Sequence, residues 1–176
     1  MDIELDPLGV VQIAEEIEHR RLRRYERIVP SCAGAASGNL CRELRAWSDQ
    51  QLGRLAGLRQ RLGETAPRAA ATDRGDSRAS NARLLTALAF FVAKDSAPEV
   101  PTVVTCEWML TDTATRSRQA VVFYEGLQGF THSRGAREVM EEIVQRENDH
   151  LHQVLLQLEA YQEARRKGGP LLACVC

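Results

Sequence analysis

The chain has few of the residues and segments that usually narrow down a function. Aromatic residues make up 5% of its 176 residues, and 23 Lys and Arg against 24 Asp and Glu leave a formal net charge of -1. Because neither sign of charge dominates, the sequence lacks the overall field that attracts nucleic acid or an acidic partner. The shortage of aromatic side chains predicts a mainly aliphatic core, and the length suits one domain.

Signals for export and for membrane insertion are missing as well. The first residues, MDIELDP, are acidic and lack the apolar run of a signal peptide. No stretch approaches the roughly 18 apolar residues that a membrane span requires. We therefore expect a cytoplasmic protein with no membrane partner. The cysteines are odd in number and match no disulfide or metal framework, which indicates a reducing environment; they are Cys32, Cys41, Cys106, Cys174 and Cys176.

Helical periodicity is the strongest pattern in the first half of the chain. Asp6-Pro7 predicts a helix start, with Asp as the N-cap and Pro at the first helical position. Apolar residues then recur at helical spacing to about Ile28. After a loop of small residues at 31–38, a second helix is expected from about 39 to 62, closed by Gly63.

The second half repeats this arrangement after a longer connection. Residues 63–81 are expected to form a surface loop, and a short apolar helix follows at about 83–94. Two more long helices are predicted at about 102–128 and 133–166. The remaining residues, 167–176, form a tail with a Cys-x-Cys pair that we interpret as a mobile or docking segment with reactive thiols.

These elements predict an all-α fold: a four-helix bundle over residues 1–166, with one long crossover that carries the short helix. The two helix pairs are related by a shift of 99 residues. That shift lays Tyr25-Glu26 on Tyr124-Glu125 and Leu44 on Ile143. We interpret this offset, which is the same for both helices of a pair, as an internal repeat.

The fourth helix contains Glu147-x-x-His150, and the first and third carry Tyr25 and Tyr124 at equivalent positions. With these motifs in this order, the chain resembles the rubrerythrin-like branch of the ferritin-like superfamily. The repeat unit of that branch is a helix with Glu-x-x-Ala-x-x-Phe-Tyr followed by a helix with Glu-x-x-His. The resemblance implies a ferritin-like bundle with a di-iron centre in its core.

The ligand set that the resemblance implies is only half present in this chain. Three ligand positions hold residues that can bind a metal ion: Glu18, Glu147 and His150. Three hold residues that bind iron poorly: Ser48, Gln51 and Ser117. On the first helix, Arg21 and Arg24 replace the Ala and Phe of the motif. Two carboxylates and one imidazole cannot offset the charge of two cations, so we expect no di-iron chemistry.

Two interpretations of the remaining residues stay open. In one, Glu18, Glu147 and His150 hold a single iron or manganese ion, with Tyr25 and Tyr124 beside it. In the other, no metal binds; Glu147 accepts hydrogen bonds from Ser48, Ser117 and Tyr25, while His150 pairs with Glu18. We favour the second, because a partial ligand set more often reflects ancestry than occupancy. The sequence also leaves open a shifted metal site that uses Asp49, Asp112 or Glu107.

The most basic run, residues 19–27, could in principle contact phosphates. Acidic residues flank it, and Glu16 with Arg20 and Glu15 with His19 are helical i, i+4 pairs. We therefore interpret the run as a solvated, salt-paired face and expect no nucleic-acid partner. The histidines His19, His132 and His152 are expected at the surface or at an interface.

The function predicted from these features is that of a non-catalytic structural or interaction module with a degenerate di-iron site. The alternative is a metal-dependent redox protein that uses the residual site. A nucleic-acid-binding bundle is the third and least favoured hypothesis. Because the short helix at about 83–94 is very apolar, we expect it both to cover the open face of the bundle and to contribute to a homodimer contact. An interaction module would also have a protein partner.

Overall fold

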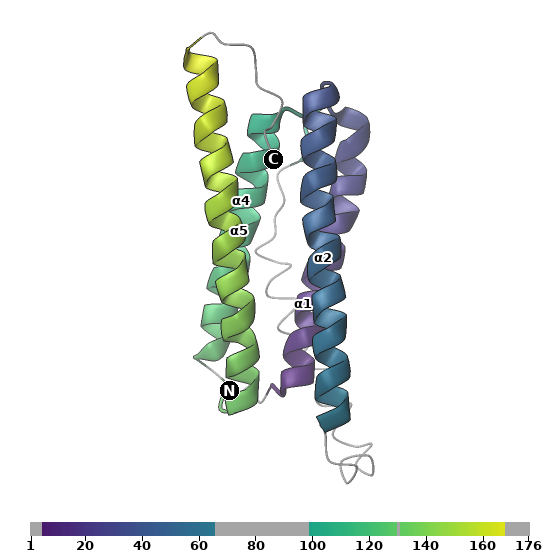
Figure 1. Ribbon diagram of the computed structural model, residues 1–176, viewed down its shortest axis with the longest axis vertical. Helices are drawn as coiled ribbons and strands as arrows, with labels where there is room; N and C mark the ends of the chain where they lie inside the picture. The colour runs from purple at the N-terminus through teal and green to yellow at the C-terminus, as the bar shows by residue number, and fades with distance from the viewer. Residues whose placement is uncertain (1–4, 66–98, 130, 168–176) are drawn as a thin grey trace.

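The computed structural model describes residues 5–65, 99–129 and 131–167, and four long helices dominate these ranges (Figure 1). They are α1 (Pro7–Ile28), α2 (Ala35–Thr65), α4 (Cys106–Gln128) and α5 (Arg134–Arg166), with a short 3-10 turn, Val29–Ser31, after α1. The all-helical bundle expected from the periodicity is therefore confirmed. The predicted short helix at about 83–94 and the Cys-x-Cys tail lie outside the described residues.

The first helix has the predicted ends. The Asp6 carboxylate accepts a hydrogen bond from the backbone N of Gly9 at 2.6 Å, and Pro7 occupies the first helical position. The side chain thereby satisfies an amide that has no partner within the helix.

The second helix is longer than predicted at both ends. It begins at Ala35, inside the expected loop, because the Ser37 hydroxyl accepts from the Gly34 amide and donates to the Gly34 carbonyl. It also continues past Gly63 to Thr65. A glycine closes a helix when it adopts a left-handed backbone conformation, and Gly63 does not adopt one here.

The third long helix starts later than predicted, at Cys106 rather than near residue 102. Val104 forms a parallel bridge with Cys32, in which its amide donates to the Ser31 carbonyl at 2.7 Å. A residue paired in this extended form cannot also belong to a helix. Thr105 then caps α4 through the Trp108 amide. The predicted limits of α5 are confirmed to within one residue, with Ser133 as its cap.

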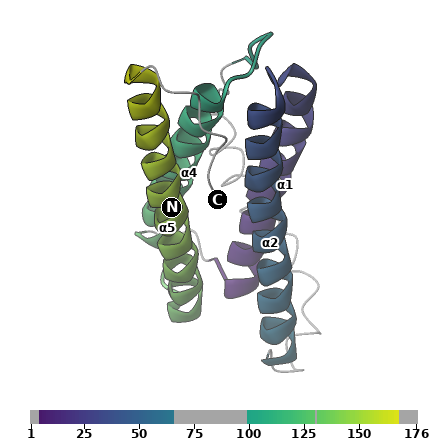
Figure 2. The same ribbon diagram turned by 45° about the horizontal axis from the view of Figure 1, so that its top comes forward.

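The helices pack as two pairs, α1 with α2 and α4 with α5, and the pairs lie side by side (Figures 1 and 2). Helices α1 and α5 run in one direction along the bundle, and α2 and α4 run in the other. The end of α2 and the start of α4 consequently lie at opposite ends of the molecule.

The core consists of two apolar clusters, one towards each end of the bundle. One cluster combines the first half of α1 with the second halves of α2 and α4 and the start of α5; it includes Ile13, Ile17, Leu55, Leu127 and Met140. The other combines the opposite ends of the same helices and includes Ile28, Leu40, Leu44, Met109 and Val154. Buried polar side chains lie between the clusters. Within the described ranges, no helix is long and apolar enough to cross a membrane.

Candidate functional site

All eight positions singled out in the sequence are buried in the middle of the bundle, each at most 8% exposed. They are Glu18, Tyr25, Ser48, Gln51, Ser117, Tyr124, Glu147 and His150. Each of the four long helices contributes at least one of them. The helical register read from the sequence therefore places the correct side chains inside, although burial alone does not show what they do.

The centre of this layer is a guanidinium group. Arg21 Nη1 donates to Glu18 Oε1 and to Glu147 Oε1, both at 2.7 Å, and Arg21 Nη2 donates to Glu147 Oε2 at 2.9 Å. The three side chains are no more than 7% exposed. One cation thus joins the two glutamates that the sequence comparison had assigned to a metal ion. The prediction that Arg21 belongs to a solvated face is wrong.

This arrangement fits an arginine ion pair rather than a metal ion. Both oxygens of Glu147 and one of Glu18 accept hydrogen bonds from Arg21. A metal ion placed between the two carboxylates would have to displace the guanidinium and would be repelled by its charge. In the part of the chain that the structure describes, no three His, Cys, Asp or Glu side chains are grouped to hold a metal. The residues present therefore do not fit the di-iron group that the resemblance implies.

The charges of the centre depend on one another. Burial raises the pKa of Glu18 to about 7; Arg21 opposes this increase and Glu147 adds to it. Burial also acts to lower the pKa of Arg21, but Glu147 and Glu18 outweigh it, and the net pKa lies above its usual value. Arg21 therefore stays charged, and Glu18 takes up a proton at a higher pH than an exposed glutamate does.

His150 packs against an aromatic ring instead of binding a carboxylate. Its imidazole stacks on Trp47 with the ring centroids 3.7 Å apart and the planes at 10°. Arg21 Cζ lies 5.6 Å from the same Trp47 ring. Burial, with a smaller effect of Arg21, lowers the pKa of His150 to about 3. His150 is therefore neutral at physiological pH, and the predicted pairing with Glu18 is not formed.

The hydrogen bonds expected for a metal-free core also differ in detail. Glu147 binds Arg21 rather than Ser48, Ser117 or Tyr25, and the Tyr25 hydroxyl lies 3.5 Å from the Thr113 hydroxyl. Burial raises the pKa of Tyr25 to about 12. Three buried oxygens have no hydrogen-bond partner among the described residues: Glu18 Oε2, Ser48 Oγ and Ser117 Oγ. Arg21 is the partner that the sequence prediction did not include, and its hydrogen bonds to Glu18 and Glu147 replace those predicted for Glu147.

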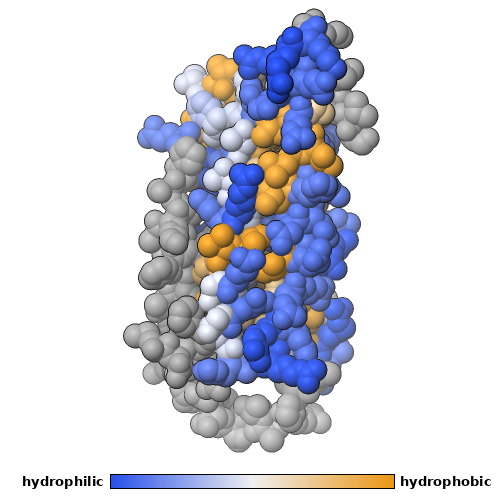
Figure 3. Space-filling view, turned by 90° about the vertical axis from the view of Figure 1, so that its left-hand side faces the viewer, coloured by the Kyte–Doolittle hydropathy of each residue, from blue (hydrophilic) through white to orange (hydrophobic). Residues whose placement is uncertain are grey.

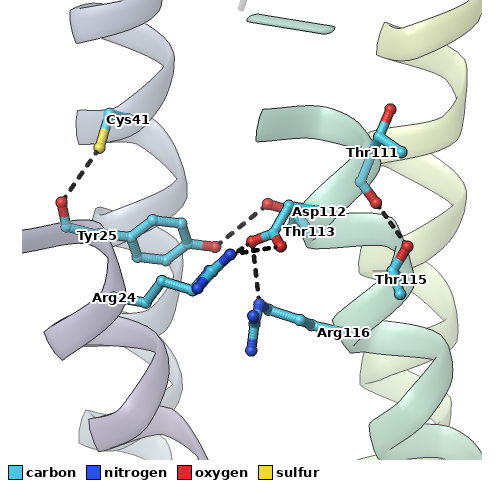
Figure 4. A network of polar contacts seen from close by, with 8 residues as sticks. All are labelled: Arg24, Tyr25, Cys41, Thr111, Asp112, Thr113, Thr115 and Arg116. Atoms are coloured by element: carbon cyan, nitrogen blue, oxygen red, sulfur yellow. Dashed lines mark hydrogen bonds and ion pairs between the residues drawn. The ribbon is translucent and has the colours of Figure 1, made fainter. Parts of the chain in front are cut away.

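A second buried ion pair lies nearer the end of α1 (Figure 4). Arg24 donates through Nε and Nη2 to both oxygens of Asp112, at 2.8 and 2.9 Å, and Arg116 donates to Asp112 Oδ2 at 3.0 Å. Arg24 Cζ also lies 5.4 Å from the Trp108 ring. Asp112, one of the residues considered for a shifted metal site, is thus held by arginines. Tyr25 lies beside this network.

The other two residues of that shifted site face outward. Asp49 is exposed and lies 3.8 Å from Arg45. Glu107 accepts hydrogen bonds from Gln162 and Arg165. Neither side chain reaches the buried layer.

The basic run is divided between surface and core. Arg20 and Arg23 both pair with Glu16 at the surface, as a salt-paired face requires. Glu15 pairs with Arg59 of α2 and not with His19. The prediction of a surface location is confirmed for three histidines, which are exposed: His19, His132 and His152. Because Arg21 and Arg24 are buried, two of the five arginines in residues 19–27 are inaccessible to phosphates.

The register of α1 contains the signal that would have found the buried arginines. Arg21 follows Glu18 by three residues, and Arg24 follows Arg21 by three, so all three lie on the face that also carries Ile17 and Tyr25. This signal was overlooked because arginine is almost never buried unless it is paired. Glu18 and Glu147, two carboxylates predicted to lie in the core without a cation, were the available indication of such a pairing.

A small pocket borders the centre, with a volume of about 40 Å³. Its buried polar lining residues are Glu18, Gln51, Tyr124 and Glu147. Burial raises the pKa of the Tyr124 phenol well above its usual value, so this hydroxyl keeps its proton. The volume is sufficient for a few water molecules.

The chain matches no protein-family model, no curated protein and no solved structure.

Proposed function

We propose that this protein is a rubrerythrin-like member of the ferritin-like superfamily in which an arginine has replaced the di-iron centre. In this proposal it acts as a non-catalytic structural or interaction module. The directions of the four helices support the ferritin-like part, because α1 with α5 and α2 with α4 run parallel. The offset of 99 residues between the helix pairs supports an origin by duplication.

The observation that carries the proposal is the pair of buried contacts from Arg21 to Glu18 and Glu147, each at 2.7 Å. A metal ion between two carboxylates supplies positive charge and fixes their geometry. A guanidinium with a fixed fork of donors supplies both without any metal. The protein would thereby keep the bundle of its relatives and lose their chemistry.

A structural or interaction role also implies a surface that contacts other proteins, and we propose a homodimer as the first such contact. On the face formed by α5 and α4, apolar residues occur as separate patches between hydrophilic ones (Figure 3). Exposed Val122 and Leu156 belong to these two helices. Sedimentation at several concentrations would show whether the chain associates.

The metal content of the purified protein tests the proposal. The protein is produced with added iron and manganese, purified without chelator, and compared with the Glu147→Ala variant by elemental analysis. We expect metal in neither sample above the level of the buffer. About one ion per chain that disappears in the variant would instead support the alternative, a mononuclear iron or manganese redox site on Glu18, Glu147 and His150.

A further inference from the structure

We propose that Cys32 and Cys41 form a redox-active dithiol, which hydrogen peroxide converts into an intramolecular disulfide and which a thiol reductant restores. Both residues lie where α1 is connected to α2: Cys32 directly follows the 3-10 turn, and Cys41 lies in the second turn of α2. Both pack in the apolar cluster that contains Leu40 and Met109. The site is separate from the polar layer around Arg21, so it goes beyond the structural role and does not depend on it.

The two thiols are held together at the end of α1. Cys32 Sγ donates to the Ile28 carbonyl at 3.7 Å. Cys41 Sγ donates to the Tyr25 carbonyl at 3.8 Å (Figure 4). Tyr25 and Ile28 are three residues apart on α1, so their carbonyls lie on one face, less than one turn apart. The thiols also interact directly, because Cys32 acts on the Cys41 thiol through its charge and a side-chain hydrogen bond.

The two thiols differ in their access to solvent. Cys32 is half-buried, whereas Cys41 is fully buried. Burial, and after it the neighbouring Cys32, raises the pKa of the Cys41 thiol to about 11, so Cys41 keeps its proton at neutral pH. Reactive cysteines are partly exposed, and buried ones are inert towards solutes. An oxidant in solution therefore meets Cys32 first, and Cys41 lies where it can react with the oxidised sulfur.

The reaction with hydrogen peroxide balances in two steps. First, the deprotonated Cys32 sulfur attacks one oxygen of the peroxide, the O–O bond breaks, and the leaving hydroxide takes up the thiol proton as water. The product is a sulfenic acid on Cys32. Second, the Cys41 sulfur attacks the Cys32 sulfur, the S–O bond breaks, and the leaving hydroxide takes up the Cys41 proton. Two thiols thereby lose two electrons, and the peroxide is reduced to two water molecules.

Other roles of these cysteines fit the structure less well. Within the described ranges, no three His, Cys, Asp or Glu side chains are grouped to hold a metal, so the pair does not form a zinc site of the usual kind. A cysteine that only packs behaves as a small apolar residue and is among the most buried types. Cys106, 5% exposed in the same cluster, fits that role. Cys32 does not, because it remains partly accessible.

Closing the disulfide requires a local movement of Cys32. The bond brings two sulfurs to about 2 Å, closer than two thiols in a hydrogen bond. Cys41 is fixed within α2, but Cys32 has an extended backbone in the connection before it. Cys32 therefore moves and gives up its bond to Ile28. The amide of the next residue, Ala33, donates to the Val104 carbonyl at 3.0 Å, so the movement reaches the segment that leads into α4.

The test is treatment of the folded, reduced full-length protein with a slight molar excess of hydrogen peroxide, followed by alkylation in denaturant, tryptic digestion and mass spectrometry. Cleavage after Arg27 and Arg42 leaves Cys32 and Cys41 in one peptide, and the other three cysteines fall in different peptides. We expect this peptide to lose two hydrogen atoms and to escape alkylation at both cysteines. A thiol reductant should restore alkylation at both.

Cysteine variants separate the roles of the two thiols. In Cys41→Ala, oxidation of Cys32 should stop at the sulfenic acid, which a cyclic 1,3-diketone traps. In Cys32→Ala, Cys41 should stay reduced, because it is buried. The matched control is Cys106→Ala, which removes a buried cysteine of the same cluster and should form the disulfide as the wild type does.

Three results would overturn the assignment: the wild-type peptide keeps two alkylated cysteines after peroxide treatment, Cys32 is found bonded to Cys106 or to another chain, or the folded Cys106→Ala variant does not form the disulfide. The wild-type measurement decides even where a variant fails to fold. Metal content does not enter the experiment, so failure of the disulfide assignment is distinguishable from failure of the proposed function.

Discussion

Arg21 is the residue on which the polar layer depends, because its guanidinium is the common partner of Glu18 and Glu147. Two carboxylates buried without a cation would repel each other and would lose their hydration. The motif comparison identified both carboxylates correctly as inner residues. It treated Arg21 as a departure from the motif, and the charge pattern placed it on a solvated face, because a pairing between residues 126 positions apart has no local signature in a sequence.

Removing the charge of Arg21 should therefore destabilise the fold strongly. Arg21→Met keeps much of the volume but leaves the carboxylates unpaired, and we expect a loss of about 3–5 kcal/mol in the free energy of unfolding, measured by urea denaturation. Adding Glu18→Gln and Glu147→Gln to this variant should restore most of the loss.

The matched control is Arg23→Met, which removes an arginine that is 55% exposed and pairs with Glu16. Its effect should stay within about 1 kcal/mol. If Arg21→Met were no more harmful than this control, the buried ion pairs would not be what stabilises the layer.

His150 should make the fold sensitive to acid. Its pKa falls from 6.5 to about 3 on folding, so its contribution to stability is complete above pH 6.5 and is lost as the pH falls towards 3. Glu18 acts in the opposite sense: its pKa rises from 4.5 to about 7, so its contribution is lost as the pH rises through that interval.

The His150→Phe variant separates the two effects, because phenylalanine can still stack on Trp47. When the pH is lowered from about 7 to about 5, the free energy of unfolding measured by urea denaturation should fall less in the variant than in the wild type. His152→Phe, the same substitution at an exposed position, should show the same decrease in the free energy of unfolding between these two pH values as the wild type. An equal acid sensitivity in His150→Phe would mean that another group is responsible.

At the scale of helices, their existence and order could be predicted, and their ends only in part. Asp6-Pro7 gave a correct start because a capping side chain acts within one turn of its own position. The start of α4 could not be predicted, because it depends on the pairing of Val104 with Cys32, far away in the sequence. The end of α2 was misplaced because Gly63 was taken as a stop although its backbone stays helical.

The Asp6 cap should contribute measurably to stability. Asp6→Ala removes the acceptor for the Gly9 amide, and we expect a loss of about 1 kcal/mol in the free energy of unfolding. Asp49→Ala, which removes an exposed aspartate on α2, should have a smaller effect in the same urea titration. Equal effects would mean that the Asp6 cap does not contribute as the geometry indicates.

At the scale of the whole molecule, two buried ion pairs tie α1 to the opposite helix pair. Arg21 reaches Glu147 on α5, and Arg24 reaches Asp112 on α4. The apolar periodicity predicted the bundle and its two apolar ends. It could not predict these polar contacts, because periodicity shows which face is buried and carries no information about partners on other helices.

The central claim, that the guanidinium of Arg21 takes the place of a metal ion, is tested most directly by titrating the chelator-treated protein with Mn²⁺ and following free Mn²⁺ by EPR. The wild type should bind no Mn²⁺ at the buried centre. The Arg21→Ala variant, with both carboxylates released, should bind about one ion per chain, as two carboxylates and an imidazole can. Stoichiometric binding by the wild type that is lost in Glu147→Ala would contradict the claim.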